Sequence, residues 1–330
     1  MRSLYKIIKF SCLGFLVLLA AIALFNSQER VFSKDTLAPT DKIKFKGKIV
    51  AEQNLSAVGF VGEYILIGSD EGNTVQVLEP NKKRSKYRVV QNIELLDNDS
   101  KPEVDIEGIA VDDNTVHVAG SHSVNEDIDR AQNNRQNIFR FQLNFDTGKL
   151  ESSIEQKSLQ TILEQDLILS QFANIPHEEN GVDIEGIATK SDRLYFGFRT
   201  PVLQDSYVPV VVVKFEEIDR TDKYDLRYVN LDGNGIRDLV AVDDGFLILA
   251  DATGENADHY QVYFWDGSDG ASKSGTLPSV KFLSEIPTKK NTRAEGITVL
   301  TETASSYQIL VVYDGVSEGN PTIFDIQKSY

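Results

Sequence analysis

Carboxylate side chains recur in a short phrase that the chain repeats at long intervals. The phrase spells DIEGIA from Asp105 to Ala110, returns with the same letters from Asp183 to Ala188, and returns altered at 293–298. Glutamates in such a phrase can act as general acids or bases, as oxygen ligands of a hard cation, or as partners of arginines. Its repetition indicates that several copies of one structural unit carry these acids.

Each copy of the phrase opens a strand–turn–strand pattern. Aligned on the acid, five copies have the key positions Val58, Glu107, Glu185, Asp238 and Glu295, so four of the five carry a carboxylate. In the first four copies, two further runs of alternating apolar and polar residues follow the pair. Four short strands repeated about every 50 residues are typical of propeller blades. The sequence therefore predicts an all-β, five-bladed β-propeller.

Two irregularities need their own explanation. The fifth copy has only one further run, 321–326, and the alternating N-terminal run 43–50 is expected to pair there and close the ring. The second and third key positions are 78 residues apart, which calls for an insertion. Apolar residues at helical spacing predict a helical insertion near 158–173. A sixth, degenerate blade in this segment is the alternative.

The N-terminus has the pattern of a targeting segment. Arg2, Lys6 and Lys9 precede an uncharged apolar run, 11–25, which is the length of a signal-peptide core. We expect 1–25 to be a signal peptide or an N-terminal membrane anchor, 26–41 a linker, and 42–330 one propeller domain. The protein is then exported, either periplasmic or secreted, or held at the inner membrane by this segment. Cys12 is the only cysteine, so no disulfide can form within the chain.

Charge limits the classes of partner. The chain has a net charge of −16, and the part after residue 25 carries −19, because the first 25 residues contain three basic side chains and no acid. This balance argues against binding nucleic acid, or an anionic membrane beyond the N-terminal segment. It fits a self-repelling monomer, or a cation or cationic ligand as partner.

In a propeller, the starts of the inner strands and the ends of the second strands meet at one mouth of the central channel. The repeat places acids, three arginines and one histidine there. We expect the polar stretch 124–137 to form a loop near the same mouth. The predicted ligand-binding residues are Asp105, Glu107, Ser121, His122, Asp183, Glu185, Arg199, Arg237, Asp238, Arg293 and Glu295.

Three interpretations of this mouth remain open. In the first, the acids bond to arginines and backbone N–H groups and cross-link the blades. In the second, Glu107, Glu185, Asp238 and Glu295 hold a Ca²⁺ ion, which would be the only cofactor. In the third, an acid of raised pKa and a base act on an ester, lactone or glycoside, with Glu107, Glu185 and His122 as the catalytic candidates.

Five ordered segments carry a family resemblance. They are Gly120 to Ser123, the two DIEGIA phrases, Gly197 to Pro201, Gly235 to Leu239, and Ala294 to Gly296 followed by Val311 to Gly315. Together they resemble an uncharacterised bacterial family of exported β-propeller proteins, described only as a domain of unknown function. The resemblance implies the fold and export but no reaction. More distantly, the phrases are similar to those of phytase-like propellers and of calcium-dependent lactonases, in which such a glutamate is a metal ligand.

The sequence thus favours an exported propeller that binds a small molecule or cation at the channel mouth. The alternatives are a calcium-dependent hydrolase of an ester, lactone or phosphoester, and a protein-interaction scaffold. Whether the protein is an enzyme is left open; if it is one, we expect a hydrolase.

Overall fold

The computed structural model describes residues 36–96, 103–124, 133–252, 260–269, 280–288 and 291–328. Residues 1–35 lie outside the described residues, and the expected signal peptide or anchor and most of the linker fall there. Within the described part, no helix is both long enough and apolar enough to cross a membrane.

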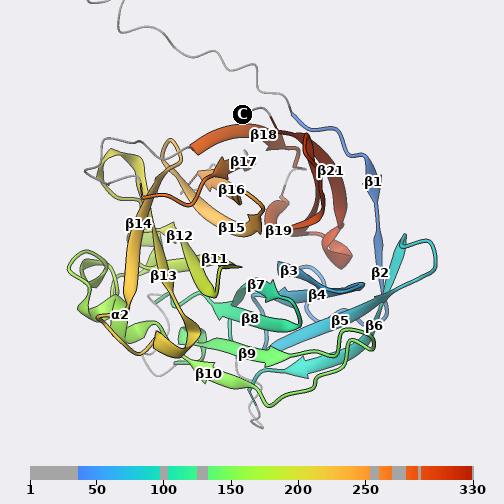
Figure 1. Ribbon diagram of the computed structural model, residues 1–330, viewed down its shortest axis with the longest axis horizontal. Coiled ribbons are helices and arrows are strands. Elements are labelled where there is room, and N and C mark those ends of the chain that lie inside the picture. Colours follow the sequence, from blue (N-terminus) through green and yellow to red (C-terminus); the bar gives the residue numbers. More distant parts are fainter. Residues whose placement is uncertain are drawn as a thin grey trace, which may run out of the picture. The chain divides into compact units, whose positions relative to one another are not determined.

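Five β-sheets stand around a common centre like the blades of a propeller (Figure 1), which confirms the five-bladed prediction. In each blade the first strand is innermost and its successors pair outward in antiparallel order. The first blade consists of β3 (Leu55–Val61), β4 (Tyr64–Ser69), β5 (Thr74–Pro80) and β6 (Lys86–Glu94), and the second of β7 (Ile106–Asp112), β8 (Thr115–Gly120), β9 (Ile138–Gln142) and β10 (Glu155–Lys157). The third consists of β11 (Asp183–Lys190), β12 (Arg193–Thr200), β13 (Tyr207–Val213) and β14 (Tyr224–Asn230), and the fourth of β15 (Asn234–Val242), β16 (Gly245–Ala252), β17 (Tyr260–Trp265) and β18 (Val280–Ile286). The fifth consists of β19 (Arg293–Glu302), β20 (Ser306–Asp314) and β21 (Thr322–Gln327).

The N-terminal segment closes the ring, but it is divided between two blades. β1 (Asp41–Lys42) pairs antiparallel with β21 and completes the fifth blade. β2 (Lys44–Lys46) then adds a parallel outer strand beside β6 of the first blade. The prediction of a single strand over 43–50 is therefore wrong. The second strand ends before Gly47, which has φ +101°. We call 41–46 the closing strap, because its two strands join the first and last blades.

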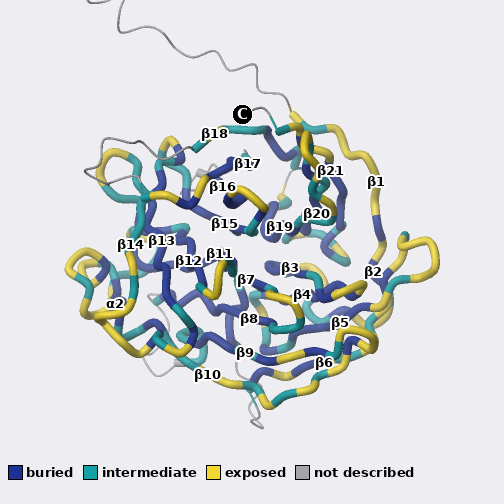
Figure 2. Tube along the Cα trace, in the orientation of Figure 1, coloured by how far each residue is buried: buried dark blue, intermediate teal, exposed yellow. Residues whose placement is uncertain are grey.

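The hydrophobic core is divided into sectors between neighbouring blades. Figure 2 shows buried inner and middle strands and more exposed outer ones. One sector joins the first and second blades through Val75, Ile106 and Phe139, and another joins the fourth and fifth. Trp265 stacks on Phe246 with ring centroids 5.2 Å apart. Because each blade is apolar on both faces, it is stabilised by both of its neighbours.

The expected helical insertion lies between the second and third blades and is shorter than predicted. It consists of α2 (Gln160–Gln165) and the 3₁₀ turns η2 (Leu169–Gln171) and η3 (His177–Glu179). Asp166 ends α2, because its carboxylate accepts hydrogen bonds from the backbone N–H groups of Ile168 and Leu169, at 2.8 and 2.9 Å. The remaining short turns are η1 (Asn133–Gln136), η4 (Gln204–Ser206), η5 (Phe215–Glu217) and η6 (Ser317–Gly319).

Candidate functional site

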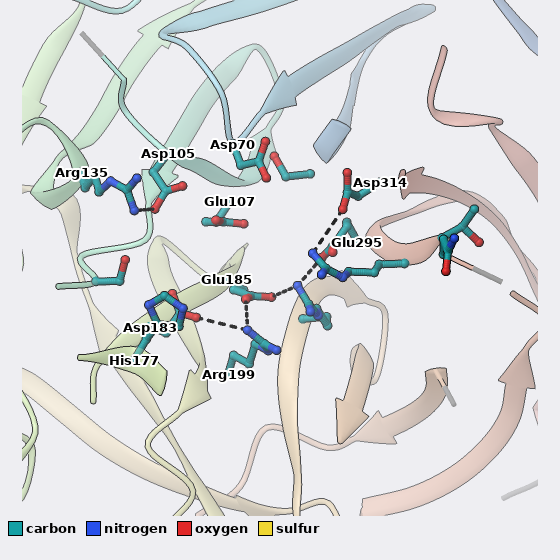
Figure 3. Close-up of a pocket in the computed structure, with 16 residues that line it drawn as sticks. Asp70, Asp105, Glu107, Arg135, His177, Asp183, Glu185, Arg199, Glu295 and Asp314 are labelled. Atoms are coloured by element: carbon teal, nitrogen blue, oxygen red, sulfur yellow. Dashed lines mark hydrogen bonds and ion pairs between the residues drawn. The ribbon is translucent and has the colours of Figure 1, made fainter. Parts of the chain in front are cut away.

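One mouth of the channel opens into a polar cavity of about 720 Å³ (Figure 3). Among the described residues, seven carboxylates and four arginines line it, which leaves a formal excess of three negative charges. The lining residues are Ser56, Asp70, Asp105, Glu107, Ser123, Arg135, His177, Asp183, Glu185, Arg199, Arg237, Asn291, Thr292, Arg293, Glu295 and Asp314. Eight of the eleven predicted ligand-binding residues are among them; Ser121, His122 and Asp238 are not.

A β-bulge near the start of every inner strand aims one side chain into this cavity. The pairing register with the second strand shifts by one residue at this point in all five blades. The bulged residues are Ser56, Glu107, Glu185, Arg237 and Glu295. An extra residue in one strand redirects its side chain, and bulges are common beside functional sites for that reason. The five-fold set is thus one serine, three glutamates and one arginine.

The bulges correct the sequence alignment in two blades. Ser56, not Val58, is the first-blade equivalent of Glu107, and Arg237, not Asp238, is the fourth-blade equivalent. Asp238 lies one residue further along, is only 2% exposed, and is not brought into the cavity. Its carboxylate accepts hydrogen bonds from its neighbour's N–H, Leu239, at 2.7 Å and from Ile297 N–H of the fifth blade at 2.8 Å. Asp238 therefore joins two blades.

Arg237 is clamped by three carboxylates. Its Nη1 lies 2.8 Å from Glu185 and 2.5 Å from Glu295, the bulged residues of the two adjacent blades. Its Nε lies 3.0 Å from Asp251, which is fully buried. Despite burial, these acids raise the pKa of Arg237 further, so it remains charged. This cluster matches the cross-linking interpretation.

Arg199 faces the same acids more loosely. Its Nη1 lies 3.4 Å from Glu185 and 3.7 Å from Asp183, and its Nε lies 3.7 Å from Asp251. Only the contact with Glu185 is a hydrogen bond, and its side chain is 20% exposed against 6% for Arg237. The two arginines therefore share carboxylates but differ in how tightly these bind them.

Glu107 differs from the other bulged glutamates. Among the described residues its carboxylate has no hydrogen-bond or ion-pair partner, although it lines the cavity between Asp105 and Glu185 (Figure 3). Burial raises its pKa well above the ordinary value, and the charges of Asp105, Glu185 and Asp183 raise it further. Of the three bulged glutamates, Glu107 is thus the one without an ion pair to a described arginine.

Asp183 is a second poorly compensated acid. It is 5% exposed and lines the cavity, yet within the described chain its only partner is Arg199 at 3.7 Å, beyond hydrogen-bond length. Burial raises its pKa well above the ordinary value, and Glu185 adds to the shift. A buried carboxylate without a donor is unfavourable unless it is protonated or meets a cation.

Asp105 is compensated by Arg135, which the sequence reasoning did not select. Arg135 Nη1 donates to Asp105 at 2.9 Å, and Ser121 donates to the same oxygen. Ser121 in turn lies 2.9 Å from the hydroxyl of Ser123, which lines the cavity. Arg135 belongs to the stretch 124–137 that was expected near the mouth; residues 125–132 of that stretch lie outside the described residues.

Asp70 and Asp314 lie at the ends of β4 and β20, on the side of the cavity formed by the first and fifth blades (Figure 3). Burial and the charge of Asp314 raise the pKa of Asp70 to about 7. Its Oδ1 is buried and has no hydrogen-bond partner among the described residues. Asp314 meets Arg293 at 3.4 Å, and Arg293 is 63% exposed at the rim.

Two histidines lie near the cavity, and only His177 lines it. His122, one of the three catalytic candidates, is 1% exposed and uses both ring nitrogens, Nδ1 with Gly120 O at 2.9 Å and Nε2 with Leu159 N–H at 3.2 Å. Burial lowers its pKa to about 4, so it stays neutral and anchors the insertion outside the cavity. His177, to which no role was assigned, lines the cavity. Its position at the end of the insertion, six residues before Asp183, was the available signal.

The expected calcium set does not converge. Asp238 points away, Glu185 and Glu295 are held by Arg237, and only Glu107 of the four stands free. Across the described ranges, no group of three His, Cys, Asp or Glu side chains has the geometry to hold a metal ion.

Three solved structures are similar to this chain. They are a nidogen/laminin complex (TM-score 0.41, 11% identity, 81% of this chain and 78% of that one), a Lactobacillus plantarum protein (0.38, 14%, 86% and 73%), and U3-55K (0.38, 11%, 86% and 67%). No curated protein matches. A family model described as "Protein of unknown function (DUF3616)" matches residues 54–147 and 142–321, which span all five blades. The chain therefore belongs to the DUF3616 family of uncharacterised β-propeller domains.

Proposed function

We propose that the cavity at the channel mouth binds a small organic molecule with a cationic group, and that Glu107 and Asp183 are its anionic anchors. The cavity volume of about 720 Å³ is in the range of small-molecule sites. Its excess of three negative charges favours a cation over an anion. As an extracellular or periplasmic binding protein, the molecule would meet such ligands in solution.

The observation that carries the proposal is the free carboxylate of Glu107. The arginines Arg135 and Arg237 are already committed to Asp105 and to the acids around Glu185, and neither reaches Glu107. A cation placed against Glu107 would offset the burial and repulsion that raise its pKa. The bound cation would therefore favour the ionised form of Glu107, and binding should release protons.

An organic cation fits better than a metal ion. Calcium takes six to eight oxygen ligands, whereas two of the expected four glutamate or aspartate ligands are bound to Arg237. An ammonium group needs only a few acceptors, and Ser123 and Ser56 in the wall offer hydroxyl oxygens beside the carboxylates. Calcium binding, which the calcium-dependent hydrolase would require, is thus the competing outcome of the test.

The test is a thermal-shift screen at pH 8 and low salt with simple aliphatic amines and, separately, CaCl₂. Amines should raise the melting temperature, because a ligand that binds only the folded state stabilises it. Glu107→Gln should abolish this shift, and its own melting temperature should not fall, because the change removes an uncompensated charge. Glu79→Gln, an exposed acid on β5, is the matched control and should keep the shift.

Two results would contradict the proposal. One is a shift with calcium and none with any amine, which would favour the metal site. The other is an amine shift of equal size in the wild type and in Glu107→Gln, which would place the amine elsewhere on the acidic surface.

A further inference from the structure

The cavity holds a second, weakly compensated acid pair, Asp70 and Asp314, separate from Glu107 and Asp183. Asp70 comes from the first blade and Asp314 from the fifth, while Glu107 and Asp183 come from the second and third. In Figure 3, Asp70 and Asp314 lie along one side of the cavity and Asp183 lies on the opposite side, with Glu107 between. The ring thus presents two anionic positions that face one space.

The second position is short of cationic partners. Among the described residues, Arg293 is the only ion-pair partner of Asp314, at 3.4 Å, and it is largely exposed, so its attraction is screened by water. The other Asp314 oxygen accepts the N–H of Gly315 at 2.6 Å. Asp70 Oδ1 is buried without a partner in the described chain. Neither Arg237 nor Arg135 has a contact with this pair.

Resting on the proposed function, we propose that the ligand is a linear dication, an aliphatic α,ω-diamine or a related polyamine. One ammonium group binds at Glu107 and Asp183, and the other at Asp70 and Asp314. Two buried carboxylates without donors, Asp183 at 5% exposure and the Oδ1 atom of Asp70, mark the two ends. Two charges on one chain also match the formal excess of three negative charges better than one.

The composition of the wall favours an aliphatic ligand. Phe, Tyr and Trp are absent from the described residues that line the cavity. A nucleobase would lack a stacking partner, and a quaternary ammonium group would lack the aromatic cage that recognises it. Primary ammonium groups instead donate three hydrogen bonds each, which suits carboxylate and hydroxyl oxygens.

The test is isothermal titration at pH 8 and low salt with matched pairs of diamine and monoamine, for example putrescine against n-butylamine. The wild type should bind the diamine at least about ten-fold more tightly than the monoamine. Once one ammonium group is bound, the second binds intramolecularly and at a high effective concentration. Asp70→Asn should reduce that ratio to about two-fold and leave the monoamine unchanged. Varying the diamine from about three to six carbons should give one optimum, where the chain spans both positions.

Glu107→Gln and Glu79→Gln separate the possible failures. If Glu107→Gln abolishes amine binding but the wild type binds the diamine and the monoamine equally, the dication is overturned and the proposed function stands. If the wild type binds neither, both fail. A diamine preference that survives Asp70→Asn also overturns the second position. Asp70→Asn removes a raised-pKa acid, so its melting curve at pH 8 should confirm that it folds, and Glu79→Gln should behave as the wild type.

Discussion

Arg237 and Arg199 lie in the same cavity and share Glu185 and Asp251, yet only Arg237 is held at hydrogen-bond distance from each of its partners. Breaking a buried ion pair on one side leaves an uncompensated charge, which costs more than the pair itself contributes. Contact length and exposure therefore assign Arg237 to the structure and make Arg199 the more loosely held of the two.

Arg237→Met should lower the free energy of unfolding by about 3–5 kcal/mol at pH 8, because three carboxylates lose their main cation. Arg199→Met should cost about 1–2 kcal/mol, since its contacts are longer and its side chain is partly exposed. Urea unfolding of both variants measures the difference. The destabilisation by Arg237→Met should shrink at pH 5, because burial raises the pKa of Glu295 and protonation then removes the repulsion. Equal losses in the two variants would contradict this reading.

At the scale of the strand, the bulges explain which parts of the site were predictable. The repeat of acids gave the blade number and eight cavity residues, because strand alternation and turn chemistry are local. The bulge adds one residue without changing the alternation around it, so a gapless alignment on acids matched Asp238, and not Arg237, with Glu107. Ile106 to Gly108 and Ile236 to Asp238 share a pattern in which an isoleucine is followed by a charged residue and then by a small or acidic one. This shared pattern is the signal that relates Glu107 to Arg237.

The histidines could not have been assigned from local patterns. His122 is set by a contact with Leu159, 37 residues away, and His177 by where the insertion returns to the third blade. Such long-range contacts depend on how the insertion packs, which periodicity alone does not determine. The same holds for the division of the closing strap between two blades.

Asp238→Ala should lower the free energy of unfolding by about 1–3 kcal/mol, because the buried N–H of Ile297 loses its acceptor at a joint between blades. Asp238→Asn keeps one acceptor oxygen and should lose less. Neither change should alter amine binding, since the side chain lies outside the cavity. Urea unfolding and titration with putrescine check both parts; loss of binding in a folded Asp238→Asn protein would return this residue to the ligand set.

At the scale of the whole propeller, the two ends of the channel differ in chemistry. The end opposite the polar cavity has a space of about 190 Å³ lined mainly by apolar residues of the five inner strands, among them Ile109, Ile187, Leu239 and Ile297. We therefore expect the proposed charged ligand to enter at the polar mouth. That mouth draws residues from all five blades, so its geometry depends on the ring remaining closed.

The closing strap should make the ring unfold as one unit. Phe45 in β2 is fully buried in the sector that also holds Leu310 and Ile323 of the last blade and Leu78 of the first. Phe45→Ala should cost about 3–5 kcal/mol, while Val90→Ala, at a 47% exposed position on the neighbouring strand β6, should cost less than about 0.5 kcal/mol. Trp265, the only tryptophan, is buried in the fourth blade and reports on unfolding far from the strap. Its fluorescence transition in urea should move together with the far-UV circular dichroism in Phe45→Ala. If the tryptophan transition stays in place while the dichroism develops an earlier phase, the blades unfold separately and the strap does not couple them.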